Sequence, residues 1–164
     1  MILLISEEYI RQNAIATEAI DYRVYKPHII ACQDLYLDEI LGVDFKDAIL
    51  VGYENKTLTP YEEQLVVYLK QMLIRRIEAA VTDFLTYRLR SKGVQTSSSG
   101  DSNAATDSEV QYSEKLLNEY ADKYYTYSCN YLNTNKIEFP LYKNGSCNAC
   151  DEDTNNTNMY FGYV

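Results

Sequence analysis

The sequence has very few of the residues that carry enzyme chemistry. It contains a single histidine, His28, and neither a Gly-x-Ser-x-Gly motif nor another nucleophile setting accompanies it, so a hydrolytic triad built on this histidine is not expected. No apolar run approaches the roughly 18 residues of a membrane helix. The opening run from Met1 to Ile5 stops at Ser6 without the basic start of a signal peptide. The sequence therefore predicts a protein that is not an enzyme, does not contact membranes and stays inside the cell or in a particle assembled there.

Basic residues are also scarce, with 15 Lys and Arg against 24 Asp and Glu and a net charge of −9. This balance argues against a sequence-reading nucleic-acid binder, which needs a basic face to pair with phosphates. The main basic concentration is Arg75, Arg76, Arg88, Arg90 and Lys92. It fits the negative end of a helix better than a phosphate site. A length of 164 residues indicates one domain plus a tail.

Tryptophan is absent, whereas tyrosine occurs 17 times. A tyrosine side chain offers a large, rigid contact area with a polar tip, so it suits a surface that becomes an interface. A codon bias towards low GC content would give the same composition, and the sequence leaves both explanations open.

The four cysteines, Cys32, Cys129, Cys147 and Cys150, are expected to be free thiols because no secretory signal accompanies them. Cys147 and Cys150 have the spacing of half a zinc site or of a redox pair. A structural zinc site needs about four ligands, and a thioredoxin motif needs a strand-to-helix context. We therefore predict neither a metal nor a cofactor. Cys147 and Cys150 are weak candidate metal ligands, and Cys32, Cys129 and His28 could complete a site with them only through the fold.

Helix signals follow one another along the first half of the chain. Ser6 is placed to cap a short helix through about Asn13. A second helix is expected to begin near Pro27 and to run to about Leu41, with Gly42 as its terminator. The third, residues 44–50, is short, capped by its first residue Asp44 and followed by a turn over residues 52–58.

The clearest signal is a long amphipathic helix from Thr59 to Arg90. The sequence Thr59-Pro60-Tyr61-Glu62 is a capping box with proline in the first helical position. Behind it, apolar residues from Leu65 to Phe84 repeat at helical spacing. About thirty residues make a rod roughly 45 Å long.

The second half is expected to contain a flexible loop over residues 91–106, because its Ser-rich sequence has little to bury. A second capping box at Thr106-Asp107-Ser108-Glu109 opens another helix, and the tyrosines along it are spaced at three and four, which predicts a buried stripe made largely of tyrosine. We place the helical domain at residues 1–133. Residues 134–164 are expected to form an extended tail with an aromatic end that tethers the chain to a partner.

Several segments together resemble the small head–tail connector proteins of tailed bacteriophages. They are Leu35-x-Leu37-x-Glu39-Ile40-Leu41-Gly42-x-x-Phe45-x-Asp47, Leu58-Thr59-Pro60, the long helix, Lys92-Gly93-Val94 before the Ser-rich loop, and the tyrosine-rich helix. The resemblance is greatest to the neck ring proteins of crAss-like phages that infect Bacteroidales. It covers about residues 3–142 and rests on the order and character of the segments, not on a catalytic motif.

This resemblance implies an all-α subunit of a structural virion protein in the neck of the particle, assembled in the cytoplasm of the bacterial host. About twelve copies would form a ring below the portal protein and extend the channel to the tail, meeting further neck and tail ring proteins. Genome DNA would pass through this channel without sequence-specific binding, which an acidic balance favours.

Three contact elements are predicted on this basis. The loop would face the channel or the portal through Lys92, Gly93, Ser97, Ser98, Ser99 and Asp101. The tyrosine-rich helix would meet a neighbouring subunit through Tyr120, Tyr124, Tyr127 and Tyr131. The tail would meet an adjacent ring through Phe139, Leu141, Tyr142, Tyr160 and Phe161.

Two other functions are compatible with the same sequence. A small helical adaptor or regulator of a host or phage partner would show the same helices. A small zinc protein would hold its metal through Cys147 and Cys150 and would lose it when Cys147 is replaced by serine.

Overall fold

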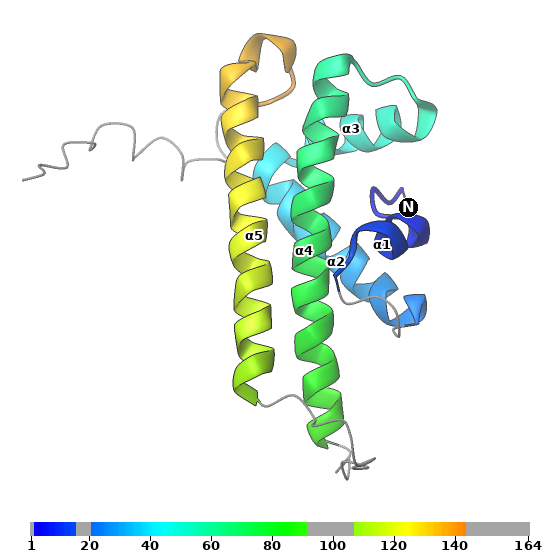
Figure 1. Ribbon diagram of the computed structural model, residues 1–164. Coiled ribbons are helices and arrows are strands. Elements are labelled where there is room, and N and C mark those ends of the chain that lie inside the picture. The colour runs from blue at the N-terminus through cyan, green and yellow to red at the C-terminus, as the bar shows by residue number, and fades with distance from the viewer. Residues whose placement is uncertain (1, 16–20, 92–106, 144–164) are drawn as a thin grey trace, which may run out of the picture.

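The structure, a computed structural model, describes residues 2–15, 21–91 and 107–143, together with the side chains of these residues except 86–91 and 107–110. These residues form five α-helices and one 3-10 turn, with no strand among them (Figure 1). The elements are α1 (Glu7–Asn13), α2 (Tyr22–Leu41), α3 (Val43–Asn55), α4 (Pro60–Ser91), α5 (Asp107–Thr134) and η1 (Lys136–Glu138). The predicted all-α class is confirmed.

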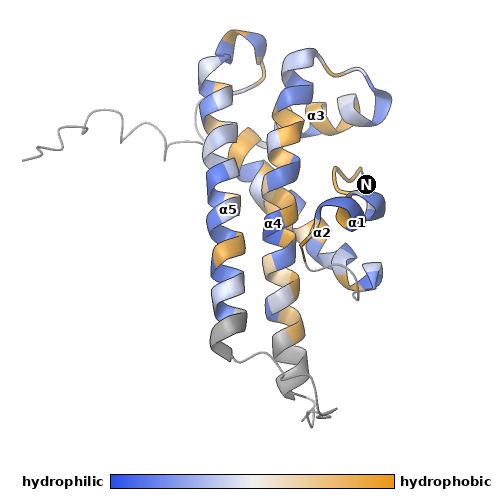
Figure 2. Ribbon diagram, viewed as in Figure 1, coloured by the Kyte–Doolittle hydropathy of each residue, from blue (hydrophilic) through white to orange (hydrophobic). Residues whose placement is uncertain are grey.

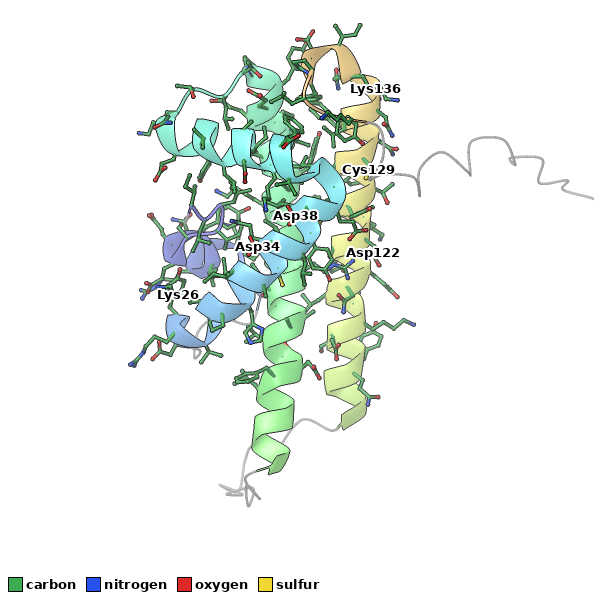
Figure 3. The ribbon with its side chains drawn as sticks, turned by 180° about the vertical axis from the view of Figure 1, so that it is seen from behind. Lys26, Asp34, Asp38, Asp122, Cys129 and Lys136 are labelled. Atoms are coloured by element: carbon green, nitrogen blue, oxygen red, sulfur yellow. The ribbon has the colours of Figure 1, made fainter. Side chains whose placement is uncertain are left out.

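Two long helices, α4 and α5, lie side by side and run in opposite directions (Figure 1). Helix α2 crosses the pair on one side, as the view from behind in Figure 3 also shows, and α1 and α3 lie beside α4. No described element covers the other side of the α4–α5 pair. This uncovered side is where the candidate site lies.

The start of the chain is fixed to α2 by one buried glutamine. The Gln33 side chain is 1% exposed; its Oε1 accepts a hydrogen bond from the Leu4 backbone N–H at 2.8 Å, and its Nε2 donates one to the Ile2 carbonyl at 2.8 Å. Because an amide side chain offers both a donor and an acceptor, Gln33 replaces the backbone partners that an isolated extended segment lacks. The apolar residues Leu4 and Ile5 are thereby held in the core.

Helix α1 begins as predicted, whereas α2 begins five residues before Pro27. Ser6 caps α1, and its Oγ accepts a hydrogen bond from the Tyr9 N–H. Asp21 caps α2 through the Arg23 N–H, and Pro27 lies inside the helix. The prediction of the start at Pro27 was wrong because an effective aspartate cap lies upstream of it, and a proline near the start of a helix removes only one backbone hydrogen bond.

Helix α3 is longer than predicted at both ends. It begins at Val43, after Gly42 with φ of +72°, a left-handed conformation that glycine adopts without strain. It then continues through Gly52, where the turn was expected. Gly52 is buried, and a Cβ there would lie 2.6 Å from Leu58 Cδ2, so this glycine allows the chain to pass closely after α3. A glycine needed for close packing was thus mistaken for a turn residue.

The capping box of α4 is present. The Thr59 Oγ1 accepts from the Glu62 N–H at 3.3 Å, and the Glu62 carboxylate accepts from the Thr59 N–H at 2.8 Å. Near its middle α4 is buried on several sides, and Figure 2 shows more apolar colour along α4 than along α5. The buried residues of α4 are Leu65, Val66, Leu69, Met72, Leu73, Ile74, Ile77, Glu78, Ala79 and Val81.

The buried stripe of α5 is not made largely of tyrosine. Its buried residues are Leu117, Ala121, Ser128, Cys129 and Leu132, three of which have small side chains. Tyr120 and Tyr127 are exposed, while Tyr124 and Tyr131 are half-buried at the edge of the core. The spacing of three and four places these tyrosines on one side of α5. That side lies next to the buried stripe and does not form it.

The fold continues past residue 133, where the tail was predicted to begin. After η1, the Phe139 ring packs against Phe45 with ring centroids 5.7 Å apart, and Tyr142 packs against the same ring at 6.3 Å. Phe139 is 1% and Tyr142 9% exposed, so both belong to the core of this chain. The expectation that they contact an adjacent ring is therefore corrected, since their rings are already buried. Leu141 between them is 48% exposed.

Candidate assembly surface

The uncovered side of α4 and α5 carries a row of tyrosines. Tyr124 and Tyr127 of α5 meet edge to face with ring centroids 5.9 Å apart, and Tyr131 meets Tyr68 of α4 in the same way at 5.6 Å. Edge-to-face contacts of this kind fix the orientation of the rings. We name as the tyrosine face the set Tyr61, Tyr68, Tyr120, Tyr124, Tyr127 and Tyr131.

The sequence predicted only the α5 half of this face. Tyr61 and Tyr68 come from α4. Both raise the pKa of the Tyr131 hydroxyl, although burial is the larger cause. The signal that could have found them is their spacing of seven residues, which places both on one side of a helix. A spacing rule alone does not show which side of α4 meets α5.

Helix α1 brings a further tyrosine to the border of the face. The Tyr9 hydroxyl accepts a hydrogen bond from Gln71 Nε2 at 3.1 Å, and the Lys70 ammonium lies 4.1 Å from the Tyr9 ring centroid. The pKa of Tyr9 is raised mainly by burial; the nearby Arg75 charge lowers it, and Tyr124 and Tyr53 raise it further. The same lysine donates to the Tyr53 hydroxyl at 3.2 Å.

The charged groups beside the tyrosine face are balanced or basic. Arg75 forms an ion pair with the buried Glu78 carboxylate, which also accepts a hydrogen bond from the Ile15 N–H. Lys123 lies with its ammonium 5.7 Å from the Tyr120 ring centroid. Beside these tyrosines the Arg75 charge is thus neutralised within the chain, and Lys123 adds a cation.

Arg76, one residue along α4, is bound within the fold. Its guanidinium donates to Asn118 at 2.6 Å and to the Asp122 carboxylate, both on α5, and lies 4.8 Å from the Tyr36 ring centroid of α2. It thus joins three helices. Both Arg75 and Arg76 are occupied by partners of this chain. They lie in the middle of α4, so the interpretation of the basic cluster as a helix-end feature does not apply to these two residues.

The opposite side of the molecule is acidic. Figure 3, the view from behind, shows Asp34 and Asp38 on α2, and the Lys46 ammonium forms an ion pair with Asp38 at 2.7 Å. The pKa of Lys46 is raised first by this hydrogen bond and further by Asp34 and Asp47. We name as the carboxylate face the set Asp34, Asp38, Glu39, Asp44 and Asp47.

Lysines neutralise only part of this carboxylate face. Lys46 pairs with Asp38, and Lys143 approaches the Asp44 carboxylate at 3.5 Å. Two exposed apolar side chains accompany the carboxylates, Leu35 at 68% exposure and Val43 at 59%. An exposed leucine in the middle of a helix surrounded by carboxylates is a feature of contact surfaces.

The cysteines give no metal centre within the described residues. Among these residues no group of three or more His, Cys, Asp and Glu side chains is placed to hold a metal ion. Cys32 is free and buried, and its burial raises the pKa of the thiol to about 11. Cys129 is disulfide-bonded, so the expectation of a free thiol is wrong at this position. The candidate zinc ligands Cys147 and Cys150 lie outside the described residues.

Other predicted contacts also fall outside the described residues. These are the loop residues Lys92, Gly93, Ser97, Ser98, Ser99 and Asp101, and the tail residues Tyr160 and Phe161. His28 is described, and its ring meets Phe84 edge to face with centroids 5.3 Å apart. In the part of the chain that the structure describes, no helix combines the length and apolar character needed to cross a membrane.

Fold and surface together define an all-α protein built on a long antiparallel helix pair with one uncovered, tyrosine-rich side. The pattern of a family of unknown function, DUF6712, matches residues 31–152, and the chain belongs to this family. The matched range starts within α2 and includes α3, α4 and α5. No curated protein matches the chain, and no solved structure matches it.

Proposed function

We propose that this protein is a structural subunit of a bacteriophage head–tail connector, forming a ring that docks below the portal and extends the DNA channel to the tail. The observation that carries the proposal is the uncovered tyrosine face. A monomeric protein has little reason to orient six aromatic side chains along one side of its two longest helices, whereas a ring subunit needs such a contact area.

The long helix pair suits the wall of a ring. Helix α4 has 32 residues and α5 has 28, which at 1.5 Å per residue gives a rigid element roughly 40–50 Å long. Two helices of this length could extend across the wall of a ring and pack against the helices of neighbouring subunits. The resemblance described above, which includes both long helices, supports the same assignment.

The acid excess supports a passage for DNA and not a binding site for it. With 24 acidic against 15 basic residues, a lumen lined by this chain would repel phosphates on balance, and a duplex would slide without adhering. The loop containing Lys92 and Asp101 is the element proposed to meet the portal or the channel. The virion neck is the corresponding location, with other neck and tail ring proteins as further partners.

The experiment that tests this function is native mass spectrometry and negative-stain imaging of the purified chain, alone and mixed with a portal protein of the same phage class. Closed rings, or a monomer recruited onto the portal in a fixed ratio, are expected. A monomer or small oligomer that ignores the portal would refute the connector assignment. Double-stranded DNA added at physiological salt should not shift the mass of the chain.

A replacement that spares the monomer sharpens the test. Tyr127 is 53% exposed, so Tyr127→Ala should change the free energy of unfolding by less than about 0.5 kcal/mol. It should nevertheless reduce ring formation, because it removes contact area at the proposed interface. The matched control is Tyr112→Ala, since Tyr112 is an exposed tyrosine of α5 outside the tyrosine face. Equal loss of assembly in both variants would contradict the role of the tyrosine face.

A further inference from the structure

We infer that the tyrosine face of one copy binds the carboxylate face of a second copy of this chain. The inference rests on the proposed ring function and specifies which two surfaces meet. The Tyr125 hydroxyl of α5 bonds Glu39 of α2, so Tyr127, two residues further along the helix, lies on the side of α5 away from α2. The carboxylate face lies on α2 and α3, with Asp34 and Asp38 labelled on α2 in Figure 3. A ring of identical subunits needs two different patches on roughly opposite sides, so that each copy contacts two neighbours.

The chemistry of the two faces is complementary. The hydroxyl groups of Tyr120 and Tyr127 form no hydrogen bond with another described residue, and the Lys123 ammonium lies 5.7 Å from the Tyr120 ring centroid. On the other face, Asp34 and Asp47 form no ion pair with a described residue at bonding distance. Tyrosine O–H and lysine N–H groups are donors, while an ionised carboxylate only accepts. The tyrosine face therefore supplies hydrogen-bond donors, and the carboxylate face supplies acceptors for them.

The apolar parts match as well. Leu35 and Val43, at 68% and 59% exposure, place hydrocarbon among the carboxylates. A tyrosine ring can cover such a side chain while its hydroxyl reaches the neighbouring carboxylate. The contact would combine apolar burial with charge-assisted hydrogen bonds, which are the stronger class of hydrogen bond.

Electrostatics selects this pairing over a symmetric one. Two carboxylate faces would repel one another, whereas two tyrosine faces would bring the Lys123 cations of both copies together, since Arg75 is already neutralised by Glu78. Only the mixed pairing places the Lys123 cation of one copy beside the carboxylate face of the next. It is also the pairing that repeats around a ring instead of closing as a dimer.

Site-specific photocrosslinking tests the contact on the full chain. Benzoylphenylalanine would replace Tyr127, and a mixture of 15N-labelled and unlabelled chains would separate crosslinks between copies from those within one. Irradiation is expected to join position 127 to peptides containing residues 34–47 of another copy. Crosslinks to α4 or α5 of the second copy, or to none of its residues in an assembled ring, would overturn the inference. The control is the same replacement at Tyr112, which should give no crosslink to residues 34–47.

Charge reversal provides a second readout. Asp34→Lys with Asp47→Lys should weaken self-assembly at least tenfold and reduce its dependence on salt. Glu8→Lys with Glu63→Lys makes the same change in net charge at exposed positions outside both faces and should leave assembly within about twofold. Equal weakening by both pairs would overturn the inference in favour of a net-charge effect.

The outcomes separate the inference from the proposed function. Rings seen by native mass spectrometry, with crosslinks that avoid residues 34–47, would leave the connector function standing and refute the pairing of faces. A chain that stays monomeric with and without a portal would refute both.

Discussion

Replacing Gln33 with leucine should detach the start of the chain from the helical body. Leucine has a similar volume but can neither accept from the Leu4 N–H nor donate to the Ile2 carbonyl, two contacts of 2.8 Å that Gln33 makes at 1% exposure. Each buried polar group left without a partner costs about 1–3 kcal/mol. Two such groups cost about 2–6 kcal/mol. The additional apolar burial of leucine offsets roughly 1 kcal/mol, so we expect a net loss of about 1–5 kcal/mol.

The assay is urea unfolding followed by far-UV circular dichroism, combined with amide hydrogen exchange at Leu4. The matched control is Gln12→Leu, because Gln12 is exposed and bonds only Glu8 at 3.2 Å among the described residues; this variant should lie within about 0.5 kcal/mol of the parent. A Gln33 variant that unfolds like the control and keeps the Leu4 amide protected would refute the reasoning. Faster exchange at Leu4 with unchanged global unfolding would show that the segment opens on its own.

Three further changes have expected outcomes. Arg76→Ala should cost more stability than Asp122→Ala in urea unfolding, because Arg76 joins three helices while the Asp122 side chain is 64% exposed, and their double-mutant coupling should stay below about 1 kcal/mol; a larger coupling would contradict this. Burial raises the pKa of the Cys32 thiol from 9.0 to about 11, so the folded state holds this proton more tightly than the unfolded chain does. The resulting contribution to the free energy of unfolding is fully present below pH 9 and is lost as pH rises through about 11. Cys32→Ala should therefore flatten the fall in stability between pH 9 and 10 in urea unfolding. In reducing buffer, a chain truncated after Lys143 should unfold near the parent, whereas truncation after Asn133 removes two buried aromatic rings and should cost at least about 3 kcal/mol; equal stability of the two would restore the tail boundary at residue 133.

Local signals in the sequence were sufficient for helix starts with side-chain caps. Ser6 and Thr59 act within three residues of the groups they bind, so the sequence alone contains the whole interaction. Gly52 shows the limit of this reasoning. Its role depends on Leu58, which approaches it only after the chain has turned, and a glycine that terminates a helix has the same appearance in sequence as one that allows close packing.

The candidate surface was predictable in character but not in extent. The spacing along α5 identified Tyr120, Tyr124, Tyr127 and Tyr131, yet the contribution of α4 depends on how far α4 is rotated about its axis against α5. Phe139 and Tyr142 were assigned to a contact because aromatic residues in a polar segment suit an interface equally well as a core. Only their packing against Phe45 distinguishes the two.

Helix α5 reverses the usual distribution of side-chain size, and this reversal links the fold to the proposed assembly. It turns the small residues Ala121, Ser128 and Cys129 inward and the large Tyr120 and Tyr127 outward. Small inward residues let two helix backbones approach closely, and α4 supplies the apolar volume of the core. In the proposed assembly, the exposed Tyr120 and Tyr127 are available to a neighbouring subunit. Tyrosine suits this position better than leucine, because its hydrated hydroxyl keeps an unassembled subunit soluble, while its ring provides contact area once a neighbour binds.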